Sequence, residues 1–177
     1  MTTRRYLDVL TGAYMIRQLP PWFENVAKRQ VRTPKVYVRD SGLLHALLGI
    51  EAYRAVLSHP KVGASWEGFA LEEVLRVVQP REAYFWSVHG QAELDLLALH
   101  RARRLGFEFK FADAPGLTRS MEIALRDLRL DALTVVYPGD KEYALGPKIS
   151  VTPLARIGGA QKPSARTSSR TRRASPS

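Results

Sequence analysis

The segment QAELDLLALHRARRLGFEFKF, residues 91–111, decides the fold that the sequence predicts. It consists of two runs of β-forming residues joined by the short basic turn HRARR. Side chains alternate across a strand, so Glu108 and Lys110 are expected on one face of the second run. The opposite face is then apolar and carries Phe107, Phe109 and Phe111.

If the two runs pair as a hairpin, Asp95 on the first run and Glu108 on the second converge beside Lys110. Two carboxylates about 4 Å apart repel by roughly 4 kcal/mol at the effective dielectric of a protein surface. A divalent cation removes this penalty, and carboxylate oxygens favour Mg²⁺ or Mn²⁺. The pattern therefore indicates a metal-dependent phosphodiesterase. An E-x-K triplet is also expected about once by chance in a chain of this size, so an ordinary half-buried strand with a solvated polar face stays open.

The spacing D-x(12)-E-x-K, with a helix before it, resembles the PD-(D/E)xK superfamily and its restriction-endonuclease-like fold. This resemblance implies that Asp95 and Glu108 bind Mg²⁺ or Mn²⁺ and that Lys110 orients or activates the attacking water. It also suggests Glu67, in the helix before the hairpin, as an additional acid near the metal. A first-turn glutamate that favours the helix dipole is an equally open interpretation of Glu67.

A longer series of segments surrounds this motif. The segment TPKVYVRDSGLLHALLGI is followed by a G-x-x-x-E helix, an aromatic strand, an E-x-D strand and the E-x-K strand. The residues at these later positions are Gly63 and Glu67, Tyr84 and Trp86, Glu93 and Asp95, and Glu108 and Lys110. The series covers about residues 4–157. It resembles the DUF4143-like C-terminal domain of unknown function attached to many bacterial and archaeal AAA+-type ATPases.

Members of that family usually carry an ATPase module with a phosphate-binding P-loop ahead of this domain. The present sequence has no G-x-x-x-x-G-K-[ST] motif and no Gly-Lys dipeptide. Nothing in it offers the cradle of backbone N–H groups that a nucleotide needs, so no ATP site is expected. The chain begins where the family's ATPase would already have finished, which indicates a truncated reading frame, a split gene or a freestanding remnant.

Length and composition fit one compact domain with a short appendage. The chain has 177 residues, of which 45% are hydrophobic, and this is enough to bury a core. It has no cysteine and therefore neither a disulfide framework nor a thiolate metal site. No segment approaches the roughly 18 apolar residues of a membrane span, and no signal peptide is recognisable. We expect a cytoplasmic protein.

The net charge of +10 is divided between the body of the chain and its C-terminal tail. Residues 158–177 contain five basic side chains, no acid and no aliphatic residue larger than alanine. This composition predicts a disordered tail. The tail could neutralise a few phosphates without sequence preference, and a solvated tail without a function is an equal alternative.

The sequence predicts three parts. Residues 1–58 are expected to form a winged-helix-like segment and linker with an exposed apolar face, which predicts a partner or poor solubility. Residues 59–157 are expected to form a nuclease-like α/β core, a restriction-endonuclease-like mixed sheet of about five strands flanked by helices. Residues 158–177 are the basic tail.

Periodicity places the elements of this core. Strands are expected at 83–88, 93–99, 105–111, 133–137 and 149–154, and helices at 64–78 and 118–128. The first helix is expected to bury Trp66, Phe69, Ala70, Val74 and Leu75. Ahead of the core, a helix is expected at 3–12, strands at 15–19 and 35–39, and a short helix at 42–48 capped by Asp40-Ser41.

Some side chains are candidates for contact with nucleic acid. Arg101, Arg103 and Arg104 in the turn HRARR could track a phosphate backbone, and a solvated basic face is the alternative. Tyr84 and Trp86 are predicted to pack in the core rather than to stack on bases.

Two classes of function follow. In the first, a Mg²⁺-dependent enzyme hydrolyses DNA through Asp95, Glu108 and Lys110, which requires these residues to be clustered and accessible. In the second, the nuclease-like fold is a non-catalytic module that binds nucleic acid or protein, and a separate ATPase subunit is a candidate partner. The second class predicts that the three residues are dispersed or covered by the N-terminal segment. The sequence indicates no oligomeric state.

Overall fold

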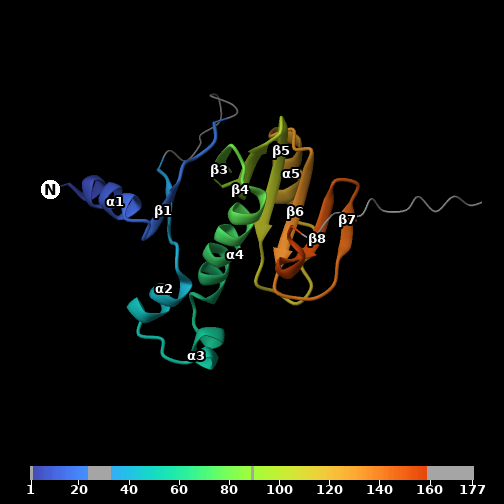
Figure 1. Ribbon diagram of the computed structural model, residues 1–177. Helices are drawn as coiled ribbons and strands as arrows, with labels where there is room; N and C mark the ends of the chain where they lie inside the picture. Colours follow the sequence, from blue (N-terminus) through green and yellow to red (C-terminus); the bar gives the residue numbers. More distant parts are fainter. Residues whose placement is uncertain (1, 24–32, 89, 159–177) are drawn as a thin grey trace, which may run out of the picture.

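The computed structural model describes residues 2–23, 33–88 and 90–158 and centres on a six-stranded mixed sheet (Figure 1). The strand order is β3-β4-β5-β6-β8-β7. The β5–β6 and β6–β8 pairs are parallel and the other three are antiparallel. The strands are β3 (Glu82–Val88), β4 (Ala92–His100), β5 (Arg103–Phe109), β6 (Ala132–Tyr137), β7 (Tyr143–Gly146) and β8 (Ile149–Pro153).

One helix covers each face of this sheet (Figure 1). Helix α4 (Val62–Val78) packs on one face and helix α5 (Arg119–Asp127) on the other, and a 3₁₀ turn, η1 (Leu154–Arg156), follows β8. The predicted α/β class is confirmed. The prediction of about five strands was one short, because β7 is a four-residue edge strand, YALG, that ends in glycine and has little period-two signal.

The β4–β5 hairpin turns over two residues only. Arg101 and Ala102 have φ values of 49° and 62°, the left-handed conformation that suits the twist of a two-residue hairpin. His100 pairs with Arg103 across the turn, and Arg104 pairs with Leu99. The longer turn predicted from HRARR was therefore wrong, since three of its five residues belong to the strands.

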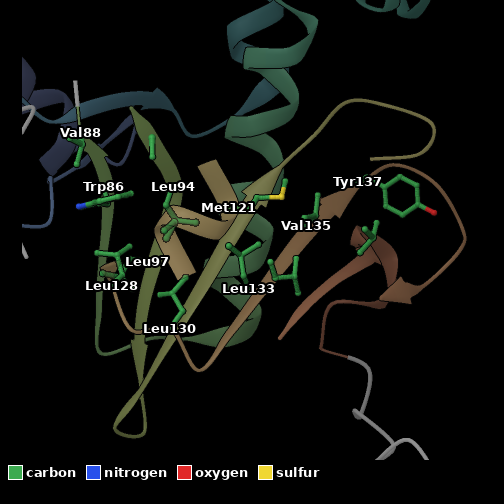
Figure 2. Packing of buried hydrophobic residues seen from close by; sticks show 14 residues of the cluster. Trp86, Val88, Leu94, Leu97, Met121, Leu128, Leu130, Leu133, Val135 and Tyr137 are labelled. Carbon is green, nitrogen blue, oxygen red and sulfur yellow. The ribbon is translucent and has the colours of Figure 1, made fainter. Parts of the chain in front are cut away.

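Two hydrophobic clusters fill the space between the sheet and its helices. The α5-side cluster contains Trp86, Leu94 and Leu97 from the sheet and Met121 from the helix (Figure 2). The α4-side cluster combines helix residues such as Leu71 with Phe85, Leu96, Phe107 and Phe109. Tyr84 packs against the edge of the α5-side cluster. The prediction that Trp86 belongs to the core is confirmed by its exposed fraction of 1%.

Phe69, predicted to be buried, and Phe111, predicted on the apolar face of its strand, are both exposed. Phe69 is 42% exposed, because helix α4 turns a face of small and aliphatic residues, among them Gly68 and Ala70, toward the rest of the protein. Phe111 is 41% exposed, because β5 ends at Phe109 and the chain leaves the sheet there. Trp66 and Leu75, also predicted as core, are only partly buried at the edge of the α4-side cluster.

The N-terminal segment consists of short elements that lie on the α4 side of the core (Figure 1). They are α1 (Thr3–Gly12), β1 (Ile16–Leu19), β2 (Lys35–Val38), α2 (Ser41–Leu47) and α3 (Tyr53–Ser58). β1 and β2 form a separate antiparallel pair. The predicted cap of α2 is present, since the Asp40 carboxylate accepts a hydrogen bond from the Leu43 N–H at 2.6 Å. Helix α3 was not predicted.

None of the three N-terminal helices contains a buried residue. The large hydrophobic side chains that they leave exposed are Tyr6, Val9, Leu10, Leu47, Tyr53 and Leu57. The structure therefore shows the apolar surface that the sequence predicted for this segment. The basic tail lies outside the described residues, apart from Gly158. Among the described residues, no helix combines the length and the hydropathy needed to cross a bilayer.

Helix α5 begins at a side-chain cap that can be tested directly. The Thr118 hydroxyl accepts a hydrogen bond from the Met121 N–H at 3.3 Å. Thr118→Ala leaves this N–H without its cap and is expected to lower the free energy of unfolding by about 1 kcal/mol, whereas Thr118→Ser keeps the hydroxyl and most of the stability. Urea unfolding of both variants measures the difference. Equal losses in the two variants would contradict a role for the cap.

Candidate functional site

A β-bulge in β4 sets the direction of the Asp95 side chain. Tyr84 of β3 pairs with Leu97 and Trp86 pairs with Leu94, so Asp95 and Leu96 together face one residue of β3. Leu94 and Leu97 both contact the α5-side cluster, and the two residues between them therefore turn toward α4. Bulges often re-aim a side chain near a functional site.

The paired part of the β4–β5 hairpin ends beside this bulge. The last paired residues are Leu96 and Phe107, so the following stretch of β5 has no backbone partner in β4. The Asp95 carboxylate fills this position, because its Oδ2 accepts a hydrogen bond from the Phe109 N–H at 3.0 Å. Asp95 is 4% exposed, and its charge is near enough to Glu108 to raise the pKa of that carboxyl.

Glu108 is the most buried acid of the site, with an exposed fraction of 2%. Its Oε2 lies 2.9 Å from the Lys110 ammonium, while its Oε1 is buried without a hydrogen-bond partner. Burial and then the Asp95 charge raise the pKa of Glu108 to about 8, although Lys110 opposes both. Burial lowers the pKa of Lys110, but the charge and hydrogen bond of Glu108 together with the Asp95 and Glu93 charges more than compensate and leave that pKa raised.

Glu67 reaches the site from the second turn of α4. The first turn of this helix contains no acid, so the interpretation of Glu67 as a first-turn residue was wrong. Its Oε1 accepts hydrogen bonds from the Tyr37 hydroxyl at 2.6 Å and from the Lys35 ammonium at 3.2 Å. The same ammonium lies 3.3 Å from Oδ1 of Asp95. Lys35 therefore links Glu67 to Asp95.

The acids around Lys35 and Tyr37 change the pKa values of both side chains. Burial lowers the pKa of Lys35, but the charges of Asp95 and Glu67 more than compensate and raise it. Burial and the Glu67 carboxylate raise the pKa of Tyr37. Both side chains therefore hold their protons at neutral pH and can act only as hydrogen-bond donors toward the acids.

Asp95 is common to two groups of predicted site residues: Lys35 joins it to Glu67, and its charge raises the pKa of Glu108, which is paired with Lys110. The structure does not bring the predicted phosphate-binding arginines to the same place. Five residues separate Arg103 from Glu108 along β5, which corresponds to roughly 17 Å. Arg104 already has structural contacts, since it donates to the Leu128 carbonyl and lies over the Trp22 ring.

The fit of a divalent cation to this site is partial. The described residues contain no ready-made group of three His, Cys, Asp or Glu side chains that could hold a metal ion. Lys35 and Phe109 already occupy the two Asp95 oxygens. On the other hand, Oε1 of Glu108 is a buried acceptor without a donor, which a cation would satisfy. Asp95, Glu108 and Glu67 are hard oxygen ligands of the kind that Mg²⁺ and Mn²⁺ take.

Lys35 and Tyr37 were not among the predicted site residues. Both belong to the strand KVYV, and period-two alternation places them on the same face. That signal was available from the sequence. Their distance along the chain from Glu67 and Asp95 gave no indication that they would meet these acids.

The fold and the site define an α/β domain whose mixed sheet carries a buried cluster of carboxylates and lysines. Residues 62–157 match the family model described as "Domain of unknown function (DUF4143)", and the chain belongs to this family. Residues 1–54 match a second model, "Domain of unknown function (DUF8612)". The resemblance to the DUF4143 domain, predicted for about residues 4–157, is confirmed for residues 62–157, whereas residues 1–54 match the other model.

Two curated mycobacterial relatives extend this comparison. They are the uncharacterized protein Mb2031c of Mycobacterium bovis and the uncharacterized protein Rv2008c of Mycobacterium tuberculosis. Each is 48% identical over 156 residues, a stretch that covers 88% of this chain and 35% of the relative. The chain thus spans about a third of the length of these relatives. No solved structure gives a significant match.

Proposed function

We propose that residues 62–157 form a divalent-metal-dependent phosphodiesterase of the PD-(D/E)xK type that acts on DNA. The observation that carries the proposal is the unpartnered Oε1 of Glu108, buried beside Asp95 and Lys110. A buried carboxylate oxygen without a donor costs free energy, and a protein that retains one usually has a use for it. A bound cation is the use that the neighbouring acids support.

The acids and the lysine of the site would have separate roles. Asp95 and Glu108 would hold Mg²⁺ or Mn²⁺, and Glu67 is joined to Asp95 through Lys35. The chemistry that such a cation would supply is stabilisation of the negative charge that develops at the phosphorus and its oxygens. The Lys110 ammonium is partly exposed and donates to Glu108, so it can also donate to a water at the edge of the site and orient it.

The restriction-endonuclease-like classification belongs to this proposal. Its support is the order of elements: helix α4, then β3, the hairpin of β4 and β5 with the acids and the lysine, then helix α5 and a parallel strand β6. A winged-helix-like N-terminal segment is the corresponding proposal for α1, β1 and β2.

A second candidate function is a non-catalytic binding module. Lys35 and Tyr37 of the N-terminal segment cover Glu67 and neutralise Asp95, as expected if the cluster only holds the protein together. In this case the exposed apolar surface of α1, α2 and α3 would contact a protein partner. A separate ATPase subunit is the partner that the family resemblance suggests, and nucleic acid is the alternative ligand.

Cleavage of supercoiled and linear DNA with Mg²⁺ or Mn²⁺ tests the first proposal. Asp95→Asn and Lys110→Ala are each expected to lower the cleavage rate about 100-fold or more, because each removes a charge at the reacting centre. Asp140→Asn and Lys141→Ala make the same changes at exposed positions outside the site and should cleave like the wild type.

The outcomes separate the two candidates when folding is checked by circular dichroism. Equal cleavage by the wild type and Asp95→Asn contradicts the assigned site. No cleavage by well-folded wild type under any of these conditions favours the binding module.

A further inference from the structure

Lys35 lies where a cation shared by Glu67 and Asp95 would be expected. Its ammonium is 3.2 Å from Oε1 of Glu67 and 3.3 Å from Oδ1 of Asp95. It belongs to β2, in the part of the chain matched by the DUF8612 model, whereas both acids belong to the DUF4143 domain. The positive charge that balances the acids is thus supplied by a different part of the chain.

Strand β2 is held on α4 by polar side chains and by the Tyr37 ring, which packs against the α4-side cluster. None of its residues is buried, and Val36 is exposed. In addition to Lys35, Tyr37 donates to Glu67. The residue after the strand, Arg39, donates from Nε to Glu72 of α4 at 3.0 Å.

Strand β1, in contrast, is anchored in the core. Leu19 is buried in the α4-side cluster. Directly after β1, the Pro20 carbonyl accepts from the Phe85 N–H, and the Trp22 N–H donates to the Phe85 carbonyl. These contacts attach β1 and its continuation to the edge of the sheet. Of the two strands, β2 is therefore the one whose position depends on charge at the acids.

A lysine ammonium and a divalent cation compete for the same oxygens. The ammonium carries one charge on a flexible stem, whereas Mg²⁺ or Mn²⁺ carries two and takes several oxygen ligands at once. The two cannot occupy the space between Glu67 and Asp95 together, because like charges at such a distance repel.

We propose that Lys35 is a built-in counter-ion of the carboxylate cluster, which a divalent cation must displace, and that its displacement loosens β2 from α4. The inference rests on the metal site of the proposed function and adds a means of regulation to it. Coupling of this kind is reciprocal. Anything that holds β2 on α4 weakens cation binding, and a bound cation weakens the attachment of β2.

Mn²⁺ titration of the full chain by calorimetry tests the competition. Lys35→Met keeps the apolar stem, removes the charge, and is expected to bind Mn²⁺ at least about 10-fold more tightly than the wild type. Lys35→Arg keeps the charge and should show no such gain. Lys141→Met removes an exposed charge elsewhere and serves as the matched control.

Hydrogen exchange of the wild type gives a second readout that needs no variant. Saturating Mn²⁺ is expected to speed amide exchange in residues 35–38 and in their ladder partners 16–19, while the strands of the six-stranded sheet keep their protection. Unchanged exchange in residues 35–38 with Mn²⁺ bound would overturn the proposed coupling.

The titrations also separate this inference from the proposed function. Equal Mn²⁺ affinity in the wild type and Lys35→Met, with binding lost in Asp95→Asn, overturns the role of Lys35 and leaves the metal site intact. Binding by neither the wild type nor Lys35→Met overturns both. Binding gained by Lys35→Met and abolished by adding Asp95→Asn supports both.

Discussion

Glu108→Gln is expected to remove most of the pH dependence of stability that the metal-free wild type shows between about pH 5 and pH 8. Burial and the Asp95 charge raise the Glu108 pKa from 4.5 to about 8. Between these values the native state binds a proton that the unfolded chain has released. The free energy of unfolding therefore falls as pH rises through this window, by up to about 1.4 kcal/mol per pH unit.

Over the whole window the loss amounts to about 3–5 kcal/mol, a large part of the stability of an ordinary domain. Glutamine is neutral at every pH in this range, so the Glu108→Gln variant should have a nearly flat profile and exceed the wild type in stability at pH 8. Glu72 does not mask the effect, because Arg17 and Arg39 overcome its burial and lower its pKa, and the change it causes lies below the window.

Urea unfolding at unit steps from pH 5 to pH 8, with a chelator present, measures these profiles. Glu51→Gln, at an exposed position, is the matched control and should keep the wild-type slope. A wild-type profile that is flat from pH 5 to pH 8 would show that Glu108 is ionised in the native state. In that case the Lys110 ammonium alone would be enough to hold the charge inside the protein.

Period-two alternation correctly predicted features that lie within a single strand, namely its approximate bounds and the side chains that share a face. The prediction of a strand at residues 133–137 agrees with β6 to within one residue, because a run of apolar residues ends at Pro138-Gly139. The same alternation correctly placed Glu108 and Lys110 on one face, where the Lys110 ammonium lies 2.9 Å from Oε2 of Glu108. It could not place Phe111, since alternation does not show where a strand ends.

The position of Asp95 depends on two features that no local pattern carries. The bulge that turns it toward α4 is a property of its pairing with β3. Its bond to the Phe109 N–H exists because the β4–β5 ladder stops at Leu96 and Phe107. Strict alternation along β4 from Leu94 would have predicted that Leu97 faces away from Leu94, whereas both contact the α5-side cluster.

The contact of Lys35 with Asp95 joins residues that are far apart in the chain. Sequence spacing within β2 places Lys35 and Tyr37 on one face, but it does not say which acids that face meets. The N-terminal segment was predicted to be winged-helix-like and to lead into the core. In the structure it supplies Lys35, the cation beside Asp95 and Glu67 in the candidate site.

Trp86→Ala is expected to lower the free energy of unfolding by about 3–5 kcal/mol, the usual cost of truncating a fully buried tryptophan. The ring is 1% exposed and lies in the α5-side cluster with Leu94, Leu97 and Leu133 (Figure 2). Alanine would leave a cavity between the sheet and α5 that the neighbouring leucines can close only in part. Tyr53→Ala, which truncates an exposed aromatic residue, should change stability by less than about 0.5 kcal/mol.

Trp86→Phe separates the two contributions of this side chain. The indole Nε1 is buried without a hydrogen-bond partner, so phenylalanine removes an unsatisfied donor while it keeps an aromatic ring in the cluster. The expected loss is therefore only about 1–2 kcal/mol. Urea unfolding of the three variants gives the order Trp86→Ala, Trp86→Phe, Tyr53→Ala from the largest loss to the smallest. If Trp86→Ala instead kept wild-type stability and lost affinity for single-stranded DNA, Trp86 would be a surface for base stacking and its place in the core would be wrong.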